Sequence, residues 1–186
     1  MKKILFALVA LASFTLVSCE KEKVGGTALE SMAGQWYVTV QGIDEDGSVL
    51  YEDEDLYGFG PFVLLTYNDA NDSSNKMFIQ DTPNAEGDLF WDFKVKVDCD
   101  LDAETFGLRG AVDYNYSIDV DITNGKILKG AATTPSGMAA DSIVFDVLFE
   151  DDKYAEANIG KPGVTTTYYY QLRMTGYRYT GLAADE

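Results

Sequence analysis

From residue 34 onward, apolar and polar residues alternate in short runs instead of recurring at helical spacing. Such alternation is typical of β-strands whose sheet has one dry face and one wet face. The pattern therefore predicts an all-β domain of about eight strands. The runs cover residues 34–41, 62–67, 77–80, 89–97, 116–122, 125–132, 143–149 and 168–174.

Polar clusters rich in Gly, Asn, Asp, Pro and Ser separate these runs and predict turns. Asn124-Gly125 has the composition of a two-residue β-hairpin turn, so we expect one between the fifth and sixth runs. Strands joined by short connections favour a single antiparallel meander, either closed into a small barrel or folded into a sandwich. Closure would remove the exposed edges of the sheet.

The N-terminus has a different pattern. Lys2 and Lys3 precede a charge-free apolar run from Ile4 to Val17, which is too short to span a bilayer and has the length of a signal segment. Leu16-Val17-Ser18-Cys19 closes this run and resembles the lipobox of bacterial lipoproteins, in which the cysteine is acylated and the chain is cut before it. The alternative is an ordinary secretory signal that ends near a cysteine.

The lipobox resemblance implies a signal peptide over residues 1–18, a lipidated tether over 19–33 and a β-barrel domain over 34–186. Cys19 would be the lipid anchor, and an anchor of two or more acyl chains holds a protein stably on a membrane. We therefore expect a lipoprotein of the bacterial cell envelope, attached to the outer membrane on either its periplasmic or its surface face.

The net charge and the counts of histidine and cysteine exclude several classes of function. The 31 acidic residues outnumber 14 basic ones, and such an acidic surface repels nucleic acid and anionic headgroups. The chain contains no histidine, which excludes a Ser-His-Asp triad, a Cys-His pair and a His-ligated zinc within it. Cys99 lies between Asp98 and Asp100, whose charges blunt a thiol nucleophile, so we interpret it as structural.

No motif assigns a catalytic residue. Ser73 and Lys76 match S-x-x-K by chance, since no S-D-N or K-T-G follows. Carboxylate pairs could hydrolyse glycosides, but the sequence singles out no pair. Residues 69–80 and 98–109 lack the glycine and the final glutamate of an EF-hand loop. We therefore expect no metal or cofactor. A looser calcium site in acidic loops such as 52–55 remains an alternative.

Two family resemblances add to this interpretation. Gly34-Gln35-Trp36 resembles the G-x-W opening of lipocalin-type barrels, which implies that Trp36 plugs the closed end under a late-strand arginine, Arg173 or Arg178. The lipobox, residues 25–39 and the ending 176–181 together resemble a bacterial lipoprotein family, the lipid-binding putative hydrolases. That resemblance implies a lipocalin-like barrel, lipid binding and a hydrolysis for which no motif is evident.

Aromatic residues would supply the inward faces of such a barrel, where they either fill the interior or line a pocket. We expect a membrane-anchored barrel that binds a lipid or another hydrophobic small molecule. The alternatives are a surface carbohydrate-binding or protein-interaction module, with a platform of Tyr37, Tyr169 and Tyr177, and a hydrolase of unknown substrate. The expected ligand-binding residues are Trp91, Phe93, Tyr116, Phe145, Phe149, Tyr168 and Tyr170.

Overall fold

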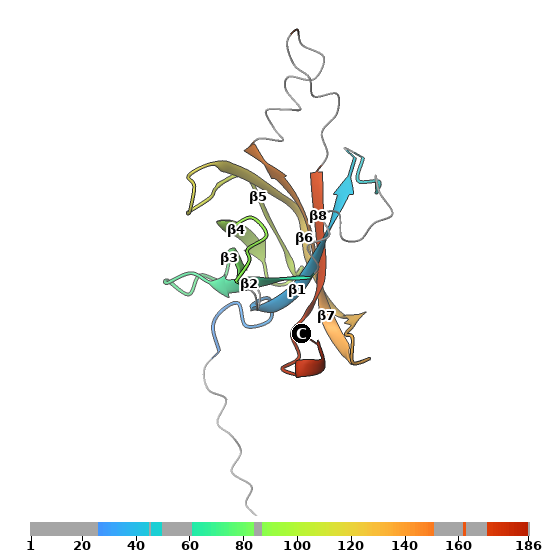
Figure 1. The fold of residues 1–186 in the computed structure, drawn as a ribbon. Helices are drawn as coiled ribbons and strands as arrows, with labels where there is room; N and C mark the ends of the chain where they lie inside the picture. The colour runs from blue at the N-terminus through green and yellow to red at the C-terminus, as the bar shows by residue number, and fades with distance from the viewer. Residues whose placement is uncertain are drawn as a thin grey trace, which may run out of the picture.

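The protein forms a closed barrel in which each strand pairs antiparallel with the next and β8 pairs with β1 (Figure 1). The computed structural model describes residues 26–44, 46–49, 61–83, 87–150, 162 and 171–185. The prediction of a single antiparallel all-β barrel is confirmed, and the sandwich is excluded. The strands are β1 (Gly34–Ile43), β2 (Phe62–Asn68), β3 (Lys76–Thr82), β4 (Lys94–Asp100), β5 (Thr105–Val112), β6 (Asp119–Thr133), β7 (Ala139–Phe149) and β8 (Gln171–Arg178).

The predicted and observed numbers of strands agree only because one strand was missed and another was predicted as two. β5 was missed, because it contains Gly107 and Gly110 and its pairing with β6 shifts register twice, so its alternation is broken. β6 is one strand of 15 residues, whereas the pattern predicted two strands and a hairpin.

Asn124-Gly125 forms a β-bulge and not a hairpin turn. Thr123 pairs with Asp146 and Lys126 with Val144, which leaves one extra residue on β6. Asn124 has a positive φ of 55°. A Cβ on Gly125 would lie 2.4 Å from the carbonyl oxygen of Phe106. Asn and Gly suit a bulge for the same reasons that they suit a hairpin, so composition alone could not separate the two.

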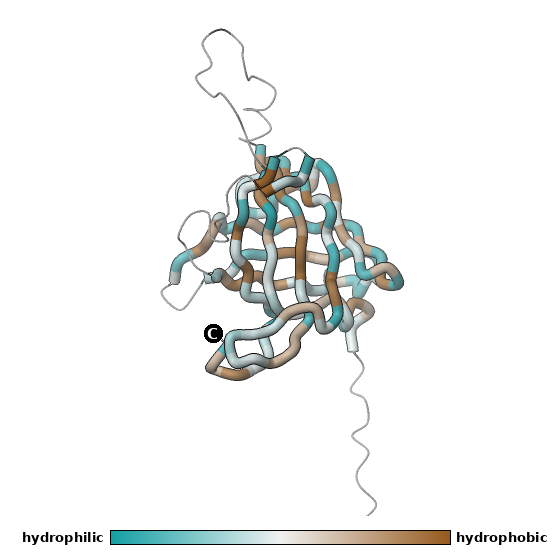
Figure 2. Tube along the Cα trace, turned by 90° about the vertical axis from the view of Figure 1, so that its right-hand side faces the viewer, coloured by the Kyte–Doolittle hydropathy of each residue, from teal (hydrophilic) through white to brown (hydrophobic). Residues whose placement is uncertain are grey.

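Side chains fill the deep interior of the barrel. Along β1, β2 and β3 buried positions alternate with more exposed ones. Brown and teal positions alternate along much of the trace in Figure 2. The largest buried side chains have almost no surface accessible to a water-sized probe, so no cavity of that size adjoins them. These side chains include Trp36, Phe62, Phe93, Phe145 and Phe149.

A tryptophan and an arginine close one end of the barrel. The Arg178 guanidinium lies 4.6 Å from the centroid of the Trp36 ring, and it donates hydrogen bonds to the carbonyl oxygens of Ala33 and Ser31, both at 2.8 Å. Leu29 and Met32 are fully buried against this end. These two apolar side chains, from the segment expected to form the tether, therefore pack against the barrel.

Arg173, the other predicted plug residue, lies elsewhere. It donates to Asp146 from Nε at 2.7 Å and from Nη2 at 3.1 Å, and to the Gly47 carbonyl at 3.2 Å. Side chains of a β-strand alternate between its two faces, so Arg178 lies on the same inward face of β8 as Leu172 and Met174. Arg173 lies between Leu172 and Met174 in the sequence and therefore faces outward. Trp36 is therefore covered by Arg178 and not by Arg173.

The Asp146–Arg173 pair gives a first prediction. Asp146 is 2% exposed, so Asp146→Ala leaves the guanidinium without its partner and should lower the free energy of unfolding by about 3 kcal/mol. Equilibrium urea denaturation measures this loss. Lys76→Ala, which removes an exposed ion pair with Asp98, is the control and should cost less than about 1 kcal/mol. Equal losses for the two variants would contradict the prediction.

Candidate ligand site at the barrel mouth

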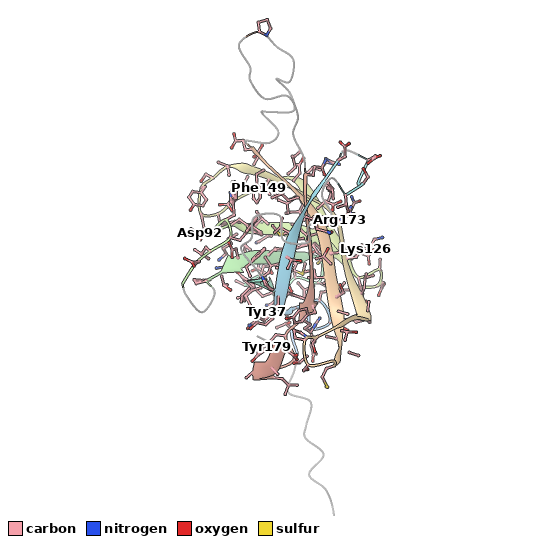
Figure 3. All side chains as sticks on the ribbon, turned by 45° about the vertical axis from the view of Figure 1, so that its right-hand side comes forward. Tyr37, Asp92, Lys126, Phe149, Arg173 and Tyr179 are labelled. Carbon is pink, nitrogen blue, oxygen red and sulfur yellow. The ribbon has the colours of Figure 1, made fainter. Side chains whose placement is uncertain are left out.

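The end of the barrel opposite Trp36 carries a chain of aromatic contacts, which we call the mouth cluster. Phe62 stacks on Phe90 with ring centroids 4.7 Å apart, and Trp91 stacks on Phe149 at 4.6 Å. Phe93 meets Phe149 edge to face at 6.0 Å. In Figure 3, Phe149 lies toward one end of the barrel while Tyr37 and Tyr179 lie toward the other. The cluster thus links β2, the β3–β4 connection and β7.

A cavity of about 390 Å³ lies beside this cluster. It is lined by Trp91, Tyr116, Ile118 and Glu150. Trp91 is 40% exposed even though one ring face is stacked on Phe149. The cavity therefore offers an apolar wall with a polar rim, which is the usual composition of a small-molecule site.

A buried carboxylate shapes the first wall of the cavity. The Oδ2 atom of Asp81 accepts hydrogen bonds from the backbone N–H groups of Trp91, at 2.7 Å, and Asp92, at 2.9 Å. Asp92 has a positive φ of 54°. These bonds hold residues 90–92 out of the strand that was predicted over 89–97, and β4 begins only at Lys94.

A turn at residues 113–117 forms the second wall. Asp113 is buried, and its Oδ1 accepts from the N–H groups of Asn115 and Tyr116, both at 2.8 Å. The Tyr116 hydroxyl then donates to Asp92 Oδ2 at 3.0 Å, and Asn115 Nδ2 donates to the Asp92 carbonyl at 2.7 Å. Tyr116 was expected on an inward strand face, but it lies in this turn and is 55% exposed.

Burial raises the pKa of Asp81, because the charged carboxylate is poorly solvated among apolar side chains. Asp81 occupies an inward position of β3, in line with Met77 and Ile79. Within the described part of the chain, its Oδ1 atom has no hydrogen-bond partner. The hydrogen bond to Asp92 also raises the pKa of the Tyr116 phenol, so this hydroxyl remains a donor.

The structure brings together four of the predicted ligand-binding residues, which are Trp91, Phe93, Tyr116 and Phe149. Phe145 lies deeper in the core, with its ring centroid 5.7 Å from that of Phe106. Tyr168 and Tyr170 lie outside the described residues. Sequence reasoning missed Asp81, Phe90 and Glu150. Asp81 was detectable, since it is a charged residue at an apolar position of an alternating run.

Other candidates have structural roles or lie outside this site. Tyr37 stacks on Tyr177 at 5.7 Å, and the Tyr177 hydroxyl donates to the Asp185 carbonyl at 3.0 Å, so this predicted sugar platform is partly covered. Its third residue, Tyr169, is not among the described residues. Burial, followed by the charge of Asp98, raises the pKa of the Cys99 thiol, which makes it a poor nucleophile.

The described residues show neither a metal-binding cluster nor a helix that could cross a membrane. Among the described residues, no group of three or more Cys, Asp or Glu side chains is arranged to hold a metal ion. The acidic loop 52–55 falls outside those residues. In the same part of the chain, no helix has the length and apolar character needed to cross a bilayer.

A closed up-and-down barrel of eight strands with an apolar mouth defines a class of small β-barrels that hold ligands. Within this class, the chain matches the family described as lipid-binding putative hydrolase over residues 21–183, and it belongs to that family. The predicted family is thus confirmed. No curated protein matches the chain.

The environment of Asp81 gives a second prediction. Asp81→Asn should stabilise the protein at neutral pH, because the amide oxygen can still accept from Trp91 and Asp92 while the buried charge is gone. The pKa of Asp81 is raised in the folded state, so its ionisation disfavours folding as pH rises through that pKa, and protonation in acid relieves the cost. The advantage of Asp81→Asn should therefore shrink at acid pH.

Urea denaturation across the acid-to-neutral range measures this dependence. Asp102→Asn is the control, because Asp102 is exposed between β4 and β5. The effect of Asp102→Asn on the free energy of unfolding should be small, because the residue is exposed. A stability gain for Asp81→Asn that does not change with pH would refute the explanation.

Proposed function

We propose that the protein binds a lipid or another hydrophobic small molecule at the barrel mouth. The observation that carries the proposal is the half-exposed Trp91 ring, which is stacked on Phe149 beside a cavity of about 390 Å³. Ligand sites commonly have volumes of about 300–1,000 Å³ and apolar walls. Membership of a family described as lipid-binding supports the same function.

The filled interior of the barrel limits where the apolar part of the ligand could lie. Because the deep side chains are fully buried, an acyl chain or ring would cover the mouth cluster and would not thread down the barrel axis. Each Å² of apolar surface buried there contributes about 25 cal/mol, so a large ring such as that of Trp91 is the strongest contact. Tyr116 and Asp92 would meet the polar end of the ligand.

We further propose that the protein is a lipoprotein, processed before Cys19 and held in the outer membrane by the acylated cysteine. The lipobox-like sequence supports this, as does the excess of acidic residues, which leaves a lipid as the favourable link to an anionic surface. The described chain begins at the closed end, where Arg178 holds the Ser31 carbonyl (Figure 1). The anchor would therefore join the barrel at the end opposite its mouth.

Trp91→Ala tests the binding proposal. It removes the exposed wall of the cavity and should weaken binding of a fluorescent fatty alcohol by about tenfold or more, as expected for the loss of a well-buried aromatic contact. Native mass spectrometry of the protein from its own host should also show less co-purifying lipid. Tyr114→Ala is the control, since Tyr114 is 57% exposed outside the cavity. Unchanged binding by Trp91→Ala would reject this site.

Cys19→Ala tests the anchor. The variant should remain unprocessed at residue 18 and should not incorporate a radiolabelled fatty acid, because the acylated sulfur is missing. Cys99→Ala is the matched control and should be labelled and processed normally. Fatty-acid labelling followed by mass spectrometry of the N-terminus measures both properties. Equal labelling of the Cys19→Ala variant and the unaltered chain would exclude the anchor.

A further inference from the structure

The polar groups around the mouth cavity are carboxylates and a phenol. Glu150 lines the cavity with Trp91 and Tyr116, and Asp92 accepts the hydrogen bond of the Tyr116 hydroxyl. From these groups we infer that the site selects ligands whose headgroup is cationic, a primary or quaternary ammonium on an apolar tail. This inference rests on the proposed function and names the substrate class of the same site.

The favourable contacts have two independent sources. A cation over the face of a Trp or Tyr ring is attracted by the ring quadrupole, and Trp is the strongest partner. Trp91 has one face stacked on Phe149 and is 40% exposed, so part of its ring remains available to a ligand. The Glu150 carboxylate is exposed at the rim and receives no hydrogen bond from any described residue, so a ligand cation could pair with it.

The cavity offers no comparable attraction to a ligand with an anionic headgroup. No Lys or Arg is among the described residues that line the cavity. Two basic residues of the described part of the chain are engaged elsewhere, since Arg173 is paired with Asp146, and Lys94 Nζ lies 5.1 Å from the centroid of the outward-facing Phe78 ring. A carboxylate or phosphate at the mouth would face Glu150 and Asp92 without a compensating cation, and like charges at short range repel.

The backbone of the site supports a binding role. Asp92 is a non-glycine residue with a φ of 54°, and it is held there by bonds from Asn115 and Tyr116 and by the bond from its own N–H to Asp81. Such conformations persist where surrounding contacts over-determine them, often at ligand sites.

Matched amphiphiles provide the test. Decyltrimethylammonium, decyl maltoside and decyl sulfate have the same tail and differ in headgroup charge. Each would be titrated below its critical micelle concentration into the purified full chain held in amphipol, with protein-free amphipol as the blank and calorimetry as the readout. We expect the cationic amphiphile to bind about tenfold more tightly than the neutral one, and the sulfate to bind most weakly.

Charge-neutralising variants locate the effect. Glu150→Gln should remove most of the preference for the cation, because it weakens binding of the cation far more than binding of decyl maltoside. Asp102→Asn removes the same charge far from the mouth and should leave the preference unchanged. Equal loss with both variants would overturn the inference, because the preference would then reflect only the net charge of −17.

The remaining outcomes separate the two proposals. Binding of decyl maltoside without a preference for the cation would overturn the headgroup inference and leave lipid binding intact. Failure of all three amphiphiles to bind would overturn both.

Discussion

Closure of the sheet by the β1–β8 pairing is the constraint on which the rest of this structure depends. Once eight strands form a ring, every inward position competes for a small interior, and large aromatic side chains fill it completely. A ligand can then be accommodated only where the strands end. One end is sealed by Trp36 and Arg178, so the mouth cluster at the other end is the natural place for binding.

The ends of the strands account for part of the acidic composition. Where a strand leaves its ladder, backbone N–H groups lose their partners, and unpaired buried N–H groups are costly. Buried aspartates satisfy these groups at several such places. Asp69 accepts from Ser73, Asp81 from Trp91, Asp113 from Lys94, and Asp185 from Ser136. Part of the negative charge is therefore structural.

Alternation was sufficient to predict the class of fold and several inward residues, because closure makes the two faces of a strand very different. Phe93 and Phe149 follow directly from that rule. Trp91 and Tyr116 do not, since their positions depend on hydrogen bonds that their backbone N–H groups donate to Asp81, on β3, and to Asp113, in the same turn as Tyr116. Alternation of apolar and polar residues carries no information about such bonds. The prediction of a hairpin turn at Asn124-Gly125 was wrong for a different reason, because the same two residues suit both a hairpin turn and a β-bulge.

The attachment of residues 31–33 to Arg178 has a mechanical consequence. A force pulling on the N-terminal segment would first load the hydrogen bond from the Ala28 N–H to Asp72 and the contacts of the buried Leu29. It would then load the hydrogen bonds from this guanidinium to the Ser31 and Ala33 carbonyls, and only after them the ladder of β1. Tension on this segment would thus be absorbed at the sealed end, and the geometry of the aromatic mouth at the other end would be insulated from it.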